Sequence, residues 1–216
     1  MMIRLLFISL ILVYISACGN NCESEKVGEQ LLGEPSKRFV PYADGETITL
    51  VGETGETIEF TNELIQSSSD RSCVKYRCEL TADPFQQTPC EYFETESIRN
   101  LLRSSDDRIY VDMIASIFNY EEETELFYDR FAINASEIGT IGRGETVTHV
   151  HFTEPNFELN TVPLLDPLIA ADEVVLQGRT FTNVLHSEVS ENMVFFQPEV
   201  GLIGMNIAGD TLVVER

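Results

Sequence analysis

Beyond residue 40 the chain consists of short runs in which apolar and polar residues alternate, separated by Gly, Asp, Glu or Asn. The clearest run is 109–117, where Ile, Val, Met, Ala and Ile occupy every second position. A period of two is typical of a β-strand that buries one face. On this pattern and its spacing, the following runs are expected to be strands: 47–51, 56–65, 71–81, 91–102, 109–117, 126–133, 147–153, 174–176, 180–186, 193–196, 201–207 and 211–215.

The same pattern predicts the architecture. No run at helical period is longer than two turns, and the expected strands follow one another at hairpin spacing. Turns are expected at 52–55, 121–123 and 139–144, and the longest irregular connection at 156–171. The sequence therefore predicts an all-β fold, an antiparallel meander of about twelve short strands that is barrel-like or a sandwich. We expect it to form a single domain over residues 41–216.

The N-terminus has a different pattern. A short start carries one positive charge at Arg4, and the segment 5–16 is apolar apart from two serines. A charged start, an apolar core of this length and small residues before a cleavage point are typical of a secretory signal peptide. The apolar core is shorter than the roughly 20 residues that a transmembrane helix needs. Residues 1–17 are therefore expected to be a signal peptide, and residues 18–40 a polar arm that holds the domain off the membrane.

The end of this segment resembles the lipobox of bacterial lipoproteins. Ile15-Ser16-Ala17-Cys18 places an aliphatic residue and two small residues before a cysteine. The resemblance implies cleavage between Ala17 and Cys18, a diacylglyceryl thioether on the Cys18 thiol, and acylation of the new amino group by a fatty acid such as palmitate. Gly19, in place of Asp, is similar to the sorting pattern of outer-membrane lipoproteins. The alternative is an ordinary signal peptide in which Cys18 is incidental.

Four further cysteines remain: Cys22, Cys73, Cys78 and Cys90. An even number in an exported protein predicts two disulfides. Cys73 and Cys78 are five positions apart on one expected strand, so their side chains point to opposite faces and should not bond to each other. Cys90 is therefore expected to pair with Cys73 or Cys78, with Cys78–Cys90 preferred and Cys22–Cys73 as the second bond. The paired short spacings of a metal tetrad, such as C-x₂-C, are absent from the sequence.

Composition and charge limit the partners. The chain has 216 residues, of which 43% are hydrophobic, so it can bury a sizeable core. It contains 14 Lys and Arg against 36 Asp and Glu, a net charge of −22. Nucleic acid is not expected as a partner, because its binding rests on basic side chains that neutralise phosphates. The acidic surface would also repel anionic lipid headgroups, so we expect attachment to the membrane through the lipid on Cys18 alone, with no other cofactor.

Five segments resemble envelope lipoproteins of unknown function from Gram-negative bacteria of the Bacteroidota type. Near the N-terminus these are 40–45 (VPYADG) and 55–60 (GETIEF), and in the C-terminal part 176–184 (LQGRTFTNV), 193–196 (MVFF) and 201–204 (GLIG). The aromatic pair Phe195-Phe196 stands where Tyr is common in that group, and the last strand lacks the frequent Trp. The resemblance implies an envelope lipoprotein and supplies no catalytic residue.

Side chains that could carry chemistry are few. His149 and His151 form an H-x-H pair on one expected strand, so both would project from one face. Two such imidazoles can share a metal ion, with His186 or a carboxylate as a third ligand. The alternative is a pair of histidines on a polar strand face. The serine-nucleophile motif G-x-S-x-G is absent, and the cysteines are assigned to lipid and disulfides, so no enzyme activity is predicted.

Three functions remain open from the sequence. The preferred one is a non-catalytic lipoprotein, anchored in the outer membrane, that binds another envelope protein or has a structural role. The second is a lipocalin-like carrier of a small hydrophobic ligand, which requires the sheet to enclose an apolar lumen. An apolar pocket of at least ~300 Å³ would favour this carrier. The third is a metal-binding protein that uses His149 and His151.

Overall fold

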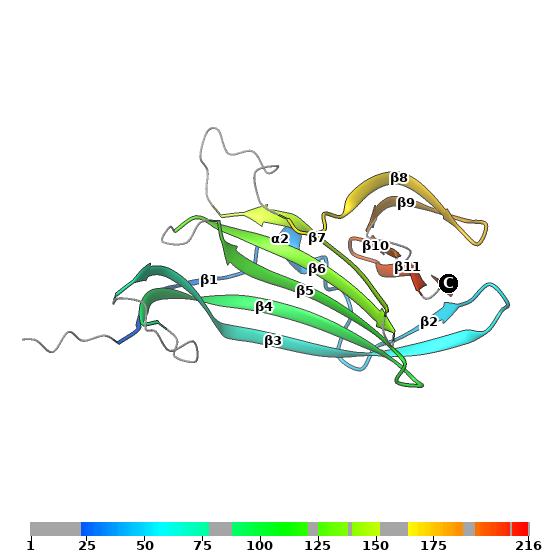
Figure 1. The fold of residues 1–216 in the computed structure, drawn as a ribbon, viewed down its shortest axis with the longest axis horizontal. Coiled ribbons are helices and arrows are strands. Elements are labelled where there is room, and N and C mark those ends of the chain that lie inside the picture. Colours follow the sequence, from blue (N-terminus) through cyan, green and yellow to red (C-terminus); the bar gives the residue numbers. More distant parts are fainter. Residues whose placement is uncertain are drawn as a thin grey trace, which may run out of the picture.

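The computed structural model describes residues 23–77, 88–120, 125–137, 140–151, 164–187, 193–207 and 209–215, with the backbone alone at 140–142, 149 and 150. In these ranges the chain forms twelve strands and one helical turn (Figure 1). They are β1 (Glu25–Gln30), α2 (Glu34–Lys37), β2 (Thr47–Val51), β3 (Thr57–Tyr76), β4 (Cys90–Ser104), β5 (Ile109–Asn119), β6 (Phe127–Glu137), β7 (Thr140–Val150), β8 (Ile169–Leu176), β9 (Arg179–His186), β10 (Met193–Gln197), β11 (Gly201–Ile207) and β12 (Asp210–Val214).

The strands form one sheet in the order β7-β6-β5-β4-β3-β2-β12-β11-β10-β9-β8. Every neighbouring pair in this order is antiparallel, and the only step that is not sequential is β2 to β12. The sheet curls into a half-barrel, which confirms the predicted all-β antiparallel meander. No helix among the described residues is long and apolar enough to span a membrane.

One part of the sheet is made of long strands that bury a single face. We call β3–β7 the long-strand half; β3 has 20 residues and β5 has 11. In β5 the residues alternate between buried and half-buried, as the period-two pattern predicts. The buried side chains face the interior of the half-barrel and are at most 6% exposed: Ile109, Val111, Met113, Ala115 and Ile117.

The other part consists of short strands that are buried on both faces. We call β10–β12 the short-strand half; its strands have 5, 7 and 5 residues. On one face Phe196 and Met205 join the main core, and on the other Phe195 and Ile203 join a second cluster. This second cluster exists because the β8–β9 hairpin folds over the short strands and packs Leu176 against them, together with Phe181 and Val184 (Figure 1).

Aromatic rings fill the interior between the two halves. Phe39, which precedes β2, lies 5.0 Å from Phe131 of β6 and 5.7 Å from Phe196 of β10, between ring centroids. Phe131 and Phe196 are themselves 4.7 Å apart. Large stacked rings bury extensive apolar area. Side chains therefore occupy this part of the half-barrel, where a lipocalin-like carrier would need an empty lumen.

A buried cluster of hydrogen bonds around Tyr42 connects the two halves of the sheet. The Tyr42 hydroxyl accepts a hydrogen bond from the backbone N–H of Leu202 at 2.8 Å. The side-chain amides of Asn62 and Asn100 both donate to the Tyr42 carbonyl, and the Asn100 carbonyl oxygen accepts from the Tyr42 N–H. Gly201 lies against the Tyr42 ring with φ +98°, where a Cβ atom would be 2.2 Å from the phenol oxygen. This hydrogen-bond cluster therefore fixes the start of β11 against β3 and β4.

The N-terminal segment differs from the expected free arm. β1 pairs in parallel with β4, beginning at Glu25 opposite Glu91. Leu32 and Val40 are buried in the main core, and Ser36 of α2 is fully buried. Backbone pairing needs no apolar side chains, so the polar composition of the segment concealed it. The described part of the arm is thus attached to the sheet from residue 25 onward.

Two strand boundaries also differ from the prediction. β3 is continuous, where two runs separated by a polar stretch at 66–70 were expected; it keeps pairing with β4 through a bulge between Ser67 and Asp70. β7 begins at Thr140, inside the stretch expected as a Gly-rich turn. The physical reason lies at Gly144, where a Cβ atom would be 2.3 Å from the Cδ2 of Leu168. The glycine makes room for a neighbouring segment against a strand.

Candidate functional site

Ala17 and Cys18, the residues implicated in lipidation, lie outside the described residues. So do two of the disulfide candidates, Cys22 and Cys78. The lipobox therefore stays a prediction.

One disulfide is present among the described residues, between Cys73 of β3 and Cys90 at the start of β4. Cys90 was expected to pair with Cys73 or Cys78, and the preferred Cys78–Cys90 bond is wrong. Cys90 pairs with Tyr76 in the β3–β4 register, and a bulge between Cys73 and Lys75 shifts the neighbouring pairs. Their Cα atoms are 5.7 Å apart, which is in the usual range for a disulfide. The bond crosses the two strands near their common end.

The structure describes the side chains of two of the three histidines, His151 and His186, and they have different partners. His149 faces Asp129 in the β6–β7 register, and its side chain lies outside the described residues. The Nε2 atom of His151 lies 2.5 Å from the Oδ1 of Asp129. His186 lies on β9, where its ring is tilted against that of Phe195 at 6.1 Å between ring centroids. Among the described residues, no three His, Cys, Asp or Glu side chains are placed to hold a metal ion.

Asp129 is the centre of a buried polar network. Its carboxylate is fully buried on β6 and accepts hydrogen bonds from the Gly33 N–H at 2.8 Å and the Ser36 hydroxyl at 2.5 Å. The Thr148 hydroxyl of β7 donates to Ser36 at 2.7 Å. Together with His151, these groups satisfy a charge that would otherwise be costly to bury.

This network has the residue types of a hydrolase but not its geometry. A nucleophilic serine needs a base in contact with its hydroxyl and access for a substrate. The Ser36 proton is directed to a carboxylate, and the Ser36 side chain is fully buried. The arrangement instead fixes α2 onto β6 and β7. Sequence reasoning missed Asp129, because its partners lie up to 96 positions away and no local motif signals them.

A more exposed feature lies where the two ends of the sheet meet. The edge strands are β7 and β8, and the segment just before β8 meets β7 at a parallel bridge between Glu145 and Pro167. There the Glu145 N–H donates to the Asp166 carbonyl and the Leu168 N–H donates to the Glu145 carbonyl, both at 2.8 Å. Beyond the bridge β7 and β8 are not paired with each other. We call this opening between the two edges the seam cleft.

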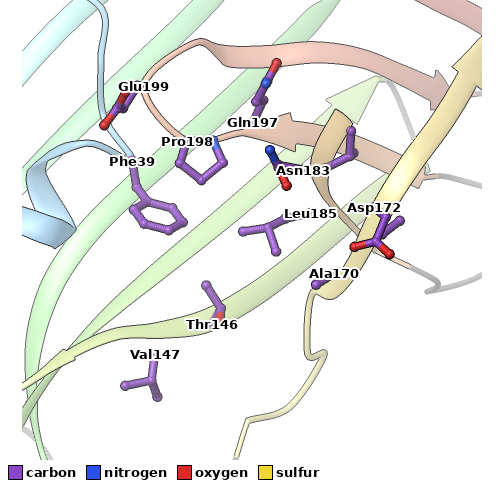
Figure 2. Close-up of a pocket in the computed structure, with 12 residues that line it drawn as sticks. Phe39, Thr146, Val147, Ala170, Asp172, Asn183, Leu185, Gln197, Pro198 and Glu199 are labelled. Atoms are coloured by element: carbon purple, nitrogen blue, oxygen red, sulfur yellow. The ribbon is translucent and has the colours of Figure 1, made fainter. Parts of the chain in front are cut away.

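The seam cleft has a volume of about 540 Å³. Phe39 of the aromatic cluster and Leu185 of β9 provide apolar lining, with Ala171 of β8 beside them. Figure 2 shows Asp172, Asn183 and Glu199 around the same space. The volume lies within the roughly 300–1,000 Å³ of typical ligand sites. The cleft is therefore large enough for a small molecule or a stretch of peptide.

Two kinds of polar group face this region. The Oε1 atom of Gln197, which lines the cleft, is buried and has no hydrogen-bond partner among the described residues. On β7, the backbone groups of Glu145 point away from β6 and into the bridge. The pairing with β6 is regular from Glu145 to Val147, up to the bulge between Asp129 and Arg130. Because backbone direction alternates along a regular strand, we expect the backbone groups of Val147 to point the same way. A ligand with N–H and C=O groups could pair with both sites. No local motif signals this cleft, since its walls come from five separate segments between Phe39 and Glu199.

Comparison of the chain with models of known protein families, with characterised proteins and with solved structures finds no match. The resemblance to envelope lipoproteins therefore rests on the sequence segments alone. The geometry of the molecule must carry any functional argument.

Proposed function

We propose that this protein is a non-catalytic, lipid-anchored lipoprotein of the outer membrane that binds an extended segment of another envelope protein in its seam cleft. The proposal has two parts, the anchor and the binding site, which are tested separately. Neither requires a cofactor beyond the lipid on Cys18.

The anchor rests on the lipobox and is supported by the disulfide. Disulfides persist in exported proteins and are rare in the cytosol, so Cys73–Cys90 fits a cell-envelope location. Ser24 accepts a hydrogen bond from the Cys90 N–H, which places the start of β1 beside that disulfide. Six residues of fully extended chain reach about 20 Å. A lipid on Cys18 would therefore keep the disulfide end of the sheet close to the membrane surface.

Substitution of Cys18 tests the anchor. Cys18→Ala should abolish labelling with radioactive palmitate and release the protein from the membrane fraction. Ser16→Thr, which keeps the cysteine, is the matched control and should leave some labelled protein. Palmitate labelling of Cys18→Ala at the level of the unchanged protein would overturn the lipobox hypothesis.

The binding site rests on one observation, the edges of β7 and β8, which are unpaired within the described part of the chain and lie beside a partly apolar cleft. Segment 166–168 already demonstrates how a chain adds to β7, through two backbone hydrogen bonds at Glu145. An extended peptide that continues this pairing past Val147 would occupy the position of a missing strand between β7 and β8. Strand addition of this kind takes its affinity from backbone hydrogen bonds and its specificity from side-chain pockets. The apolar part of the cleft, at Phe39 and Leu185, would provide such a pocket.

A small apolar ligand is the second candidate, because the cleft exceeds the ~300 Å³ that a carrier requires. The two candidates differ in their need for the β7 backbone. Ala171→Trp should fill the cleft and abolish both kinds of binding. Val147→Pro removes one outward-pointing N–H from an edge strand, where proline is tolerated. It should abolish peptide binding and leave a small ligand bound.

The experiment is capture of partners from envelopes with these variants. Val175→Trp is the matched control for Ala171→Trp, because Val175 lies on the same strand, is 59% exposed and does not line the cleft. We expect a partner retained by the unchanged protein and by Val175→Trp, and lost with Ala171→Trp and Val147→Pro. Capture that is unaffected by Ala171→Trp would contradict the proposed site. Loss with Ala171→Trp alone would assign the cleft to a small ligand.

A further inference from the structure

The outer face of the long-strand half has an unusual charge distribution. On β5–β7 and on the part of β4 that pairs with β5, its outward positions carry Arg99, Arg103, Arg130 and Arg143, with Asp112 and Glu145 as the acids among them. The whole chain contains 14 basic and 36 acidic residues, so basic residues outnumber acidic ones here against the overall ratio. On the neighbouring β3, Glu63 lies opposite Leu101 in the register. The far end of β4 carries Glu91, Glu94 and Glu96, so the basic character is confined to the part of the face where β4 pairs with β5 and continues to β7.

Three of these arginines line a groove on that face. The groove has a volume of about 460 Å³ and is bordered by Arg99 and Arg103 of β4 and Arg143 of β7. Asn134 and Arg143 also line an adjoining hollow of about 210 Å³. Leu101, Asp112, Asn134 and Arg143 form one line across the four strands. The groove therefore runs across the strands from β4 toward the bridge at Glu145.

The arginines retain hydrogen-bond donors. Arg99 makes a two-bond contact with Asp112, at 2.6 and 2.9 Å, which uses two of its five N–H groups and raises the pKa of its guanidinium. Arg143 pairs with Asp166 through its Nε atom. Arg103 is the least engaged, since its closest carboxylate oxygen, on Asp107, is 3.8 Å away. The side chains of Arg103 and Arg143 are 54% and 53% exposed.

We propose that this groove binds an acidic oligosaccharide, with its carboxylate, sulfate or phosphate groups on Arg103 and Arg143. Arginine N–H groups form paired hydrogen bonds to such oxyanions. The two arginines stand three strands apart, about 14 Å at strand spacing, so the ligand must be extended and carry at least two charges. Between them lie the Tyr110 ring and the polar side chains of Asn134 and Ser136. These groups match sugar rings and hydroxyls.

The net charge of the protein does not prevent this contact. At physiological ionic strength charges are screened beyond about 8 Å, so the ligand responds to the arginines nearest to it. Distant carboxylates weaken binding only at low salt. The groove lies on the outer face of the sheet, whereas the seam cleft is reached between the sheet edges, so the two sites are tested independently.

The test is calorimetric titration of the folded domain with three probes: a sulfated heparin hexasaccharide, trigalacturonate and neutral maltohexaose. We expect binding of at least one acidic probe and none of maltohexaose. Arg103→Gln and Arg143→Gln should each weaken the bound probe about tenfold, the loss of one charge-assisted contact. Both side chains are half exposed, so the variants should melt at the temperature of the unchanged protein.

Arg71→Gln is the matched control, because Arg71 also stacks on a tyrosine, with its guanidinium carbon 4.6 Å from the Tyr92 ring, as Arg103 does at 5.5 Å from Tyr110. It removes the same charge outside the groove and should leave the affinity within twofold. Equal weakening by Arg71→Gln would mean non-specific attraction to the whole charge and would overturn the proposal. Absence of binding by both acidic probes, or equal binding of maltohexaose, would overturn it as well.

Discussion

The long-strand half and the short-strand half are parts of one sheet, yet their sequences encode burial in different ways. In the long strands, apolar residues alternate with polar ones, because the outer face of β4–β6 meets solvent. In the short strands, runs such as 194–196 and 202–203 are apolar without interruption and are buried on both faces. The difference arises from the β8–β9 hairpin, which covers one half only. A single sheet can thus change from two layers to three along its width.

The largest expected effect comes from removing the same side chain in both halves. Ile203 points toward the hairpin and is fully buried, while Ile114 occupies an outward position on β5 and is partly exposed. Ile203→Ala should lower the free energy of unfolding by about 2–5 kcal/mol, since it leaves a cavity in a packed cluster. Ile114→Ala should cost less than about 1 kcal/mol. Urea denaturation of both variants measures the difference.

Similar losses in the two variants would contradict the comparison. They would mean either that the hairpin does not cover Ile203 in solution or that another element covers Ile114. Denaturation of Leu176→Ala separates these cases, because Leu176 belongs to the hairpin side of the second cluster. It should destabilise the protein only if the hairpin is in place.

The next effect concerns the end of the long-strand half. The Cys73–Cys90 disulfide closes a loop with a sequence separation of 17, and it lies where β3 and β4 extend beyond β2 and β5. Loop-closure entropy predicts that Cys73→Ser/Cys90→Ser lowers the free energy of unfolding by about 3 kcal/mol. A denaturation midpoint equal to that of the unchanged protein would show that strand pairing alone fixes this end. Adding reductant to the double variant should change nothing further at this pair.

The remaining two cysteines extend this prediction. Two disulfides were expected in the exported protein, and Cys73–Cys90 leaves Cys22 and Cys78 to form the second. Mass spectrometry of the mature protein without reduction should then detect no alkylated thiol. Two alkylated cysteines would contradict the second bond and leave the first intact. Peptide mapping of the oxidised protein would identify the partners directly.

The contrast between the halves explains what the sequence could predict. The alternation of apolar and polar residues identified β5 and β6, because one face of each strand is apolar. Short apolar runs between turn residues identified β10–β12. Features held by backbone contacts were missed: β1 pairs with β4 through polar residues, and the polar stretch 66–70 remains part of β3. The glycines at 139–144 suggested a turn, but Gly144 lies within β7 and accommodates Leu168 at the bridge. The seam cleft and Asp129 depend on contacts between distant segments, which a period cannot reveal.

The smallest predicted effect concerns Tyr42, which connects the two halves. Burial raises the pKa of its phenol above the ordinary value of 10, and only the neutral form fits the folded protein. Stability from this group is therefore fully present below about pH 10, the unfolded pKa, and is lost as the pH rises above it toward the folded pKa. Tyr42→Phe removes the acceptor for the Leu202 N–H and should cost about 1 kcal/mol at pH 8. In urea denaturation at pH 8 and pH 10.5, the variant should lose less stability between the two pH values than the unchanged protein.

Burial also raises the pKa of Tyr128, so Tyr128→Phe is the control for alkaline titration outside the hydrogen-bond cluster at Tyr42. An identical alkaline loss in the unchanged protein and Tyr42→Phe would mean that the phenol does not couple the short strands to β3 and β4.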